Sequence, residues 1–158
     1  MNSKPVFNGL TNKDASIFYH FLCIYEQKVK PFLATTTFRQ RNPNVARLID
    51  SMDITILPKS QYSAIPNKIH QGEKLILLGD EKKVYKEFFR HLRNALAHGL
   101  LERKRDYYVF MDVGDVKLSK TETKKNQKTA CCRVEKGKID NILIDIIIET
   151  IKEQRFRS

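Results

Sequence analysis

The sequence predicts a mainly α-helical fold, a helical bundle with a short two-stranded β-hairpin before the last helix. Three stretches place apolar residues at helical spacing, and a fourth, near the C-terminal end, is almost entirely apolar. One run of β-type residues stands between the third and fourth stretches. The length of 158 residues suits a single domain, covering residues 1–158, that is large enough to bury a core.

The first predicted helix starts at Thr11 or Asn12, either of which can cap it, and runs to about Leu33. Its apolar residues recur on one side, as expected of an amphipathic helix, and include Ile17, Phe21, Tyr25 and Phe32. Pro31 kinks or ends this helix, because proline has no amide hydrogen to donate.

A second, shorter helix is predicted from Pro43, with Asn42 as its N-cap. Its apolar residues follow at helical spacing: Val45, Leu48, Ile49 and Met52. From residue 54 to 79 this periodicity is lost and prolines and glycines interrupt the chain. We expect irregular structure there, and the pattern leaves its arrangement open.

The third helix opens at Asp80 and ends at Gly99, a residue suited to the left-handed conformation that closes helices. One broad face is apolar and consists of Val84, Tyr85, Phe88, Phe89, Leu92, Ala95 and Leu96. The other face consists of Lys86, Glu87, Arg90, Arg93, Asn94, Ala97 and His98. His91 and Arg90 are read as surface residues, and Arg90 is also a candidate phosphate contact.

Three residues of that polar face, Arg93, Asn94 and His98, form the candidate site. Taken alone, Arg93 reads as a solvated side chain and His98 as a partner of the helix dipole. Asn94 is a poor helix former away from the apolar face, so the sequence offers no packing reason for it. Together the three place a guanidinium, an amide and an imidazole at one helix end, which favours a function or an interface.

A basic run, Arg103, Lys104 and Arg105, follows this helix and is a candidate nucleic-acid contact. A strand from Tyr107 to Asp112 then pairs with a second strand from Ala130 to Val134. The lysine-bearing segment between them, Lys117 to Lys128, is predicted to be a long mobile loop that either solubilises the chain or contacts nucleic acid.

The last helix is predicted from Ile139 to about Gln154. Its polar stripe is narrow, so we expect burial on more than one side, part of it in a homodimer interface.

Charge and composition restrict the partners. Lysine and arginine number 29 against 18 acidic residues, a net charge of +11, which favours nucleic acid. An anionic membrane surface is the weaker alternative, because no segment combines a basic face with an apolar face that the core does not need. Solubility alone also explains a basic charge.

The sequence shows no stretch of signal-peptide or transmembrane length, so we expect a cytoplasmic protein with no membrane partner. Three cysteines, Cys23, Cys131 and Cys132, cannot all pair within one chain, which favours reduced thiols. No histidine stands at zinc-ligand spacing from them, and we predict neither metal nor cofactor.

The segment from Arg93 to Gly99, RNALAHG, resembles the Arg-x4-His signature of HEPN domains, in which asparagine often follows the arginine. The resemblance extends to a long helix ending in the motif, a short β excursion and a closing apolar helix. It implies a metal-independent endoribonuclease of the toxin or phage-defence type, with Arg93 and His98 catalytic and Asn94 supporting. HEPN toxins that are neutralised by a nucleotidyltransferase carry a tyrosine where this chain has Leu100.

The same chemistry follows from the residue types. Metal-free RNA cleavage needs proton transfer at the 2′-hydroxyl and the leaving 5′-oxygen, which histidine supplies near neutral pH. Arginine offers donors matched to phosphate oxygens. The motif holds one histidine, which cannot easily be acid and base at once, so we expect a homodimer that presents two. The expected products have 2′,3′-cyclic phosphate and 5′-hydroxyl ends. The alternatives are a non-catalytic HEPN module that binds nucleotides or nucleic acid, and an interaction protein that docks an acidic partner or antitoxin.

Overall fold

The chain is built around a five-stranded mixed sheet in the order β1-β2-β5-β4-β3, so the prediction of a mainly α-helical bundle with one short hairpin is wrong. The computed structural model describes the backbone of residues 9–157 and the side chains of residues 9–154. The strands are β1 (Ile54–Leu57), β2 (Lys74–Leu78), β3 (Leu101–Lys104), β4 (Tyr107–Lys117) and β5 (Thr123–Glu135). The principal helices are α1 (Asn12–Ile24), α2 (Thr35–Arg41), α3 (Pro43–Asp50), α4 (Val84–Ala97) and α5 (Lys136–Arg157).

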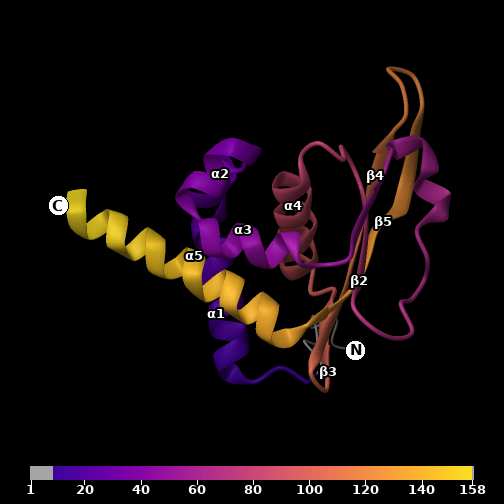
Figure 1. Cartoon of the computed structure of the whole chain (residues 1–158). Coiled ribbons are helices and arrows are strands. Elements are labelled where there is room, and N and C mark those ends of the chain that lie inside the picture. Colours follow the sequence, from indigo (N-terminus) through magenta and orange to yellow (C-terminus); the bar gives the residue numbers. More distant parts are fainter. Residues whose placement is uncertain (1–8, 158) are drawn as a thin grey trace.

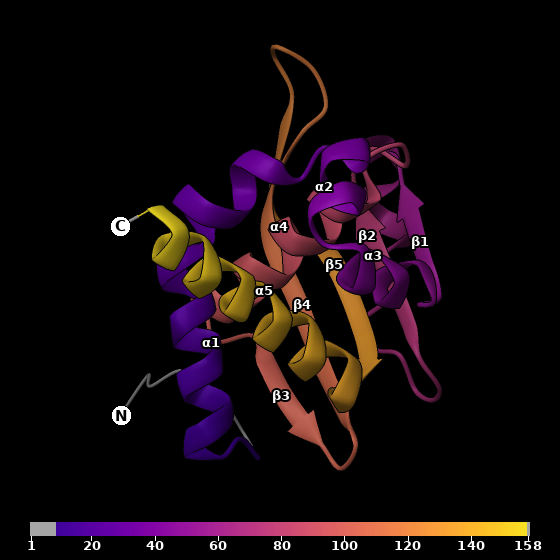
Figure 2. The ribbon, with the colours of Figure 1, turned by 60° about the vertical axis from the view of Figure 1, so that its left-hand side comes forward.

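The helices α1 to α5 lie on one face of the sheet, and a short 3₁₀ segment, η3 (Lys59–Ala64), lies on the other (Figures 1 and 2). The larger core fills the space between sheet and helices, with α4 in its middle: Phe88, Phe89, Leu92 and Ala95 are each at most 1% exposed. A smaller apolar cluster under η3 joins Ile65, Ile69 and Leu78 to β4 and β5. The sheet therefore has apolar side chains packed against both of its faces.

Two of the unpredicted strands come from residues 54–79, where irregular structure was expected. β1 and β2 run parallel, with Ile54 opposite Leu75, and the 16 residues from Pro58 to Glu73 make the crossover between them. β2 then pairs antiparallel with β5, with Leu75 opposite Cys132. Four- and five-residue strands are too short to show a clear period, and the prolines and glycines that suggested irregular structure lie in the crossover and turns around them.

The predicted pairing of residues 107–112 with 130–134 is confirmed, with Tyr108 opposite Val134 and Met111 opposite Cys131. The prediction of a long mobile loop from Lys117 to Lys128 is wrong. β4 and β5 continue as a two-stranded ribbon to the pair Lys117 and Thr123, which leaves only residues 118–122 between them. The β5 half of the ribbon, residues 123–128, is entirely polar, so its sequence has the composition of a loop although its backbone is paired.

The predicted helices are largely present. Thr11 caps α1 through a capping box with Asp14, and the helical path continues through a π turn, η1 (Tyr25–Val29), and a 3₁₀ turn, η2 (Lys30–Phe32), at Pro31. Helix α2 was not predicted, whereas α3 begins at Pro43 as expected. The third predicted helix is α4, which starts at Val84 rather than Asp80.

The closing helix α5 packs on α1, α3 and the sheet, so it is buried on more than one side. Its second half still exposes Ile148 and Ile151, with 43% and 41% of each residue accessible. Within the described residues, no helix has the length and apolar character needed to cross a membrane.

Candidate functional site

The predicted trio lies at the C-terminal end of α4, where the structure joins two of its members directly. Nη1 of Arg93 donates to Oδ1 of Asn94 at 3.2 Å. His98 is the C-cap residue, its φ of −96° lies outside the helix range, and Gly99 follows with φ +68°. The imidazole of His98 is exposed and takes part in none of the hydrogen bonds or ion pairs among the described residues. Arg93 is oriented and His98 is free.

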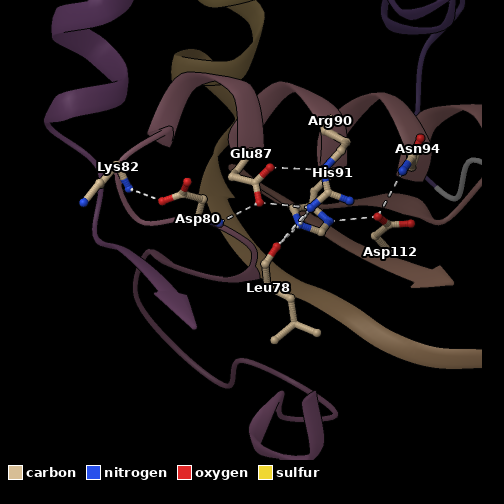
Figure 3. Close-up of polar contacts among 8 residues, drawn as sticks. All are labelled: Leu78, Asp80, Lys82, Glu87, Arg90, His91, Asn94 and Asp112. Atoms are coloured by element: carbon tan, nitrogen blue, oxygen red, sulfur yellow. Dashed lines mark hydrogen bonds and ion pairs between the residues drawn. The ribbon is translucent and has the colours of Figure 1, made fainter. Parts of the chain in front are cut away.

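Asn94 has a structural reason for its place, contrary to the reading of the sequence. Its amide Nδ2 donates to Oδ2 of Asp112 on β4 at 3.2 Å (Figure 3). Asp112 follows Tyr108 and Phe110 at alternate positions of β4, and all three side chains point towards the helices. Asn94 therefore connects the sheet to Arg93 through the two ends of one amide.

His91 is completely buried, so its assignment to the surface is wrong. Its Nδ1 lies 2.8 Å from Oδ2 of Asp112, and its Nε2 lies 2.7 Å from the carbonyl oxygen of Leu78 on β2. The Nε2 atom also lies 3.1 Å from Nη2 of Arg90, so both ring nitrogens have polar partners inside the fold. The ring thus ties α4 to two strands, as Figure 3 shows.

Asp112 is the acidic member of this buried pair. Burial acts to raise the pKa of its carboxyl, but the hydrogen bonds and positive charge of His91 and the amide of Asn94 outweigh it and lower the pKa below the ordinary value. The carboxylate is therefore the stable form in the folded protein. With 0% and 4% of their side chains exposed, His91 and Asp112 are a clamp inside the fold and do not reach a substrate.

Arg90 extends the same network at the surface. It donates to the carbonyl oxygen of Leu78 at 3.1 Å and to Oε2 of Glu87 at 3.1 Å. Glu87 is itself buried against Gly79, where an added Cβ would lie 1.2 Å from Oε2. Arg90 keeps 40% of its side chain exposed, so it remains a candidate phosphate contact with its charge partly balanced.

The basic run after α4 is a hairpin whose three residues point in different directions. Arg103 turns towards the helices, with Nη1 4.0 Å from the buried carboxylate of Asp14. Lys104 pairs with Glu102 at 3.4 Å, and Arg105 forms the turn with φ +57°. Lys104 and Arg105 remain exposed to solvent, whereas Arg103 is half-buried.

The spacing of polar residues in the sequence could have indicated the buried pair of His91 and Asp112. Glu87, His91 and Asn94 are four and three residues apart, so they form one polar ridge along the edge of the apolar face of α4. Asp112 shares the alternation of the inward residues of β4. A polar ridge beside the core facing an inward carboxylate predicts a buried hydrogen-bonded pair.

Comparisons with family models, curated proteins and solved structures find no match. The resemblance to HEPN domains therefore rests on the motif from Arg93 to Gly99.

Replacing Asp112 with Asn should lower the free energy of unfolding by about 1–3 kcal/mol, because an amide takes the place of the buried carboxylate whose Oδ2 contacts both His91 and Asn94. Urea unfolding followed by circular dichroism measures this. Asp115→Asn, on the exposed part of the same strand, is the matched control and should change little. An equal effect of the two variants would show that the pair stabilises nothing.

The difference in the free energy of unfolding between wild type and Asp112→Asn should depend on pH in one direction. The folded pKa of Asp112 is lowered, so its stabilisation is complete above the unfolded value of about 3.9 and is lost as the pH falls below it towards the folded pKa. The gap between wild type and Asp112→Asn should narrow when unfolding is repeated at about pH 3. A gap that widens in acid would contradict the assignment of a carboxylate.

Proposed function

We propose that this protein is a metal-independent endoribonuclease whose site combines Arg93 and His98 from two copies of the chain. Arg93 contacts the scissile phosphate and His98 transfers protons. Asn94 orients Arg93. No metal or cofactor takes part in this mechanism.

The observation that carries the proposal is the hydrogen-bonded path that ends at Arg93. It begins at the buried His91, passes through Asp112 and Asn94, and reaches the guanidinium of Arg93 at the surface. A side chain that serves only solubility needs no such support. A side chain that must meet a phosphate in one orientation does, because positioning supplies much of the rate of a phosphoryl transfer.

The free imidazole of His98 suits proton transfer. It stands in the exposed last turn of α4, so a ribose can approach it. One imidazole removes the proton of the 2′-hydroxyl, and a second, from the other copy, protonates the departing 5′-oxygen. The guanidinium of Arg93 balances the charge on the phosphate. The products are a 2′,3′-cyclic phosphate and a 5′-hydroxyl end.

The resemblance of the motif to HEPN signatures supports the same reaction and a role as a toxin or in phage defence, in the cytoplasm. It also makes an antitoxin or another acidic protein a partner to look for. Leu100 stands where neutralised HEPN toxins have tyrosine, so control by modification at that position is not part of the proposal.

The exposed apolar residues of α5 support the second copy. Ile144, Ile147, Ile148 and Ile151 follow at helical spacing, and the last two are the most exposed of them. Packing this stripe against the same stripe of a second copy would remove its apolar surface from water.

The second candidate function is a module that binds RNA without cutting it. The partly exposed charges around α4, Arg90 and Arg93, suit phosphate binding whether or not cleavage follows. Binding that persists in His98→Ala, with no cleavage by the wild type, would select this alternative.

His98→Ala and Arg93→Ala should each reduce RNA cleavage by about 10² or more, because each removes a group that acts on the reacting atoms. Gel analysis of cleaved RNA, with and without EDTA, measures this, and EDTA should leave the wild-type rate unchanged. His70→Ala and Arg47→Ala are matched controls, since both residues are exposed and lie elsewhere in the fold. Full activity in either motif variant, or complete loss with EDTA, would sink the mechanism.

The homodimer should depend on α5. Light scattering should give the wild type twice its chain mass of 18.5 kDa, and Ile148→Lys with Ile151→Lys should give the single-chain mass and lose cleavage. Val113→Lys introduces the same charge at another exposed apolar residue and should leave the dimer intact. A wild type that stays at 18.5 kDa at micromolar concentration would contradict the composite site.

Binding of RNA should weaken with salt through Lys104 and Arg105, the freely exposed members of the basic hairpin. Replacing both with Ala should lower the slope of log K against log salt by roughly 0.7 per lost phosphate contact. All sequences should be affected alike, because phosphate contacts position the strand without reading it. Equal slopes for the double variant and the wild type would show that Lys104 and Arg105 do not contact RNA and serve only the solubility of the protein.

A further inference from the structure

A groove of about 400 Å³ lies on the face of the sheet opposite the helices. The half-buried Val109 and Met111 of β4 form its floor, and Asn67 and Lys68 of the crossover stand on one side. β3 stands on the other side with Glu102 and Lys104. Its volume lies in the range of small-ligand sites.

The floor is apolar and the described part of the chain leaves it uncovered. On this face η3 packs against β2, β4 and β5. The alternation of β4 directs Val109 and Met111 away from the main core, which takes Tyr108 and Phe110 instead. The side chains of Val109 and Met111 therefore supply apolar surface to the groove.

The rim is basic. Two lysines, Lys68 and Lys104, line the groove together with one acidic residue, Glu102. A third lysine, Lys128, lies next to it and donates a hydrogen bond to the side chain of Asn67, which also lines the groove. The pair between Lys104 and Glu102 is exposed on both sides, so it exchanges readily for a phosphate. Because Lys128 donates to the amide oxygen of Asn67, the amide nitrogen of Asn67 is left to donate to a ligand.

A further planar cation lies on the same face beyond Val109. The guanidinium of Arg133 lies 3.7 Å from the ring centre of Tyr107, and Arg133 faces Val109 across the two strands. Arginine planes and aromatic rings are the groups on which unstacked bases rest in single-stranded RNA complexes.

The position of the groove links it to the motif. Gly99 and Leu100, the two residues directly after His98, line one end of it. A ligand in the groove therefore lies beside the residues that directly follow α4.

We infer that this groove, formed by residues 67–68, β3 and β4, takes an unstacked base of single-stranded RNA and so places the adjacent phosphate at the end of α4. The inference rests on the proposed function for the nature of the substrate. It adds that the protein acts on unpaired RNA and binds it partly through a base, in contrast to the phosphate contacts of the basic hairpin.

The test measures binding and not cleavage. His98→Ala protein, which leaves the RNA whole, is titrated with fluorescent single-stranded RNA, with the same RNA carrying abasic sugars, and with an RNA duplex. The single-stranded RNA should bind about tenfold or more tightly than the abasic one, the loss expected for one stacked base, and more tightly than the duplex. Equal affinity for the intact and abasic strands would overturn the inference. This comparison changes only the RNA, so it requires no substitution among the residues of the groove.

A pair of variants then locates the base. Val109→Glu places a carboxylate on the floor and should weaken binding about tenfold, whereas Val113→Glu makes the same change on β4 outside the groove and should not. Thermal unfolding checks that both variants fold. Photo-crosslinking of thiouridine-bearing RNA should label the peptide containing Val109 and Met111.

These experiments distinguish a failure of the groove inference from a failure of the proposed function. Binding that is unchanged in Val109→Glu, with crosslinks only outside β3 and β4, overturns the groove and leaves RNA cleavage by Arg93 and His98 standing. No binding of any RNA by His98→Ala, together with no cleavage by the wild type, overturns both.

Discussion

The buried pair of His91 and Asp112 is the interaction on which the rest of the structure depends. It joins the middle of α4 to β4, and through the carbonyl oxygen of Leu78 it joins the same helix to β2. Polar side chains inside a core are tolerated only when they are hydrogen-bonded, which restricts where the helix can lie. An apolar helix face slides over a sheet at small cost, whereas this pair allows one register.

That constraint has a consequence at the surface. Because Asn94 donates to the same carboxylate oxygen that faces His91, the end of α4 is fixed along with its middle. Arg93 is then held through the other end of the Asn94 amide. The exposed His98 comes one helical turn later, at a C-cap that Gly99 closes. A buried pair of side chains thus influences where a guanidinium lies at the surface.

Local features of the chain were predictable where one physical cause dominates. The cap at Thr11, the start of α3 at Pro43 and the end of α4 at Gly99 each follow from backbone chemistry of one or two residues. The sheet was not predictable in the same way, because β1 and β2 are short and β3 carries a charged sequence, LERK, that its pairing with β4 overrides. His91 shows the limit for the site. A histidine on the border of an apolar face reads as exposed until its partner, Asp112, 21 residues later, is known to face it.

The central claim is that the clamp positions Arg93 for a reaction, and Asn94→Ala tests it most directly. The measurement is the single-turnover rate of cleavage at saturating RNA, taken beside the RNA affinity and the thermal midpoint of the same protein. The account predicts a clear fall in the cleavage rate, smaller than that of His98→Ala, with the affinity nearly unchanged, since Asn94 orients Arg93 and transfers no proton. A rate equal to that of the wild type would show that Arg93 needs no positioning and that the chain from His91 to Arg93 serves only the stability of the fold.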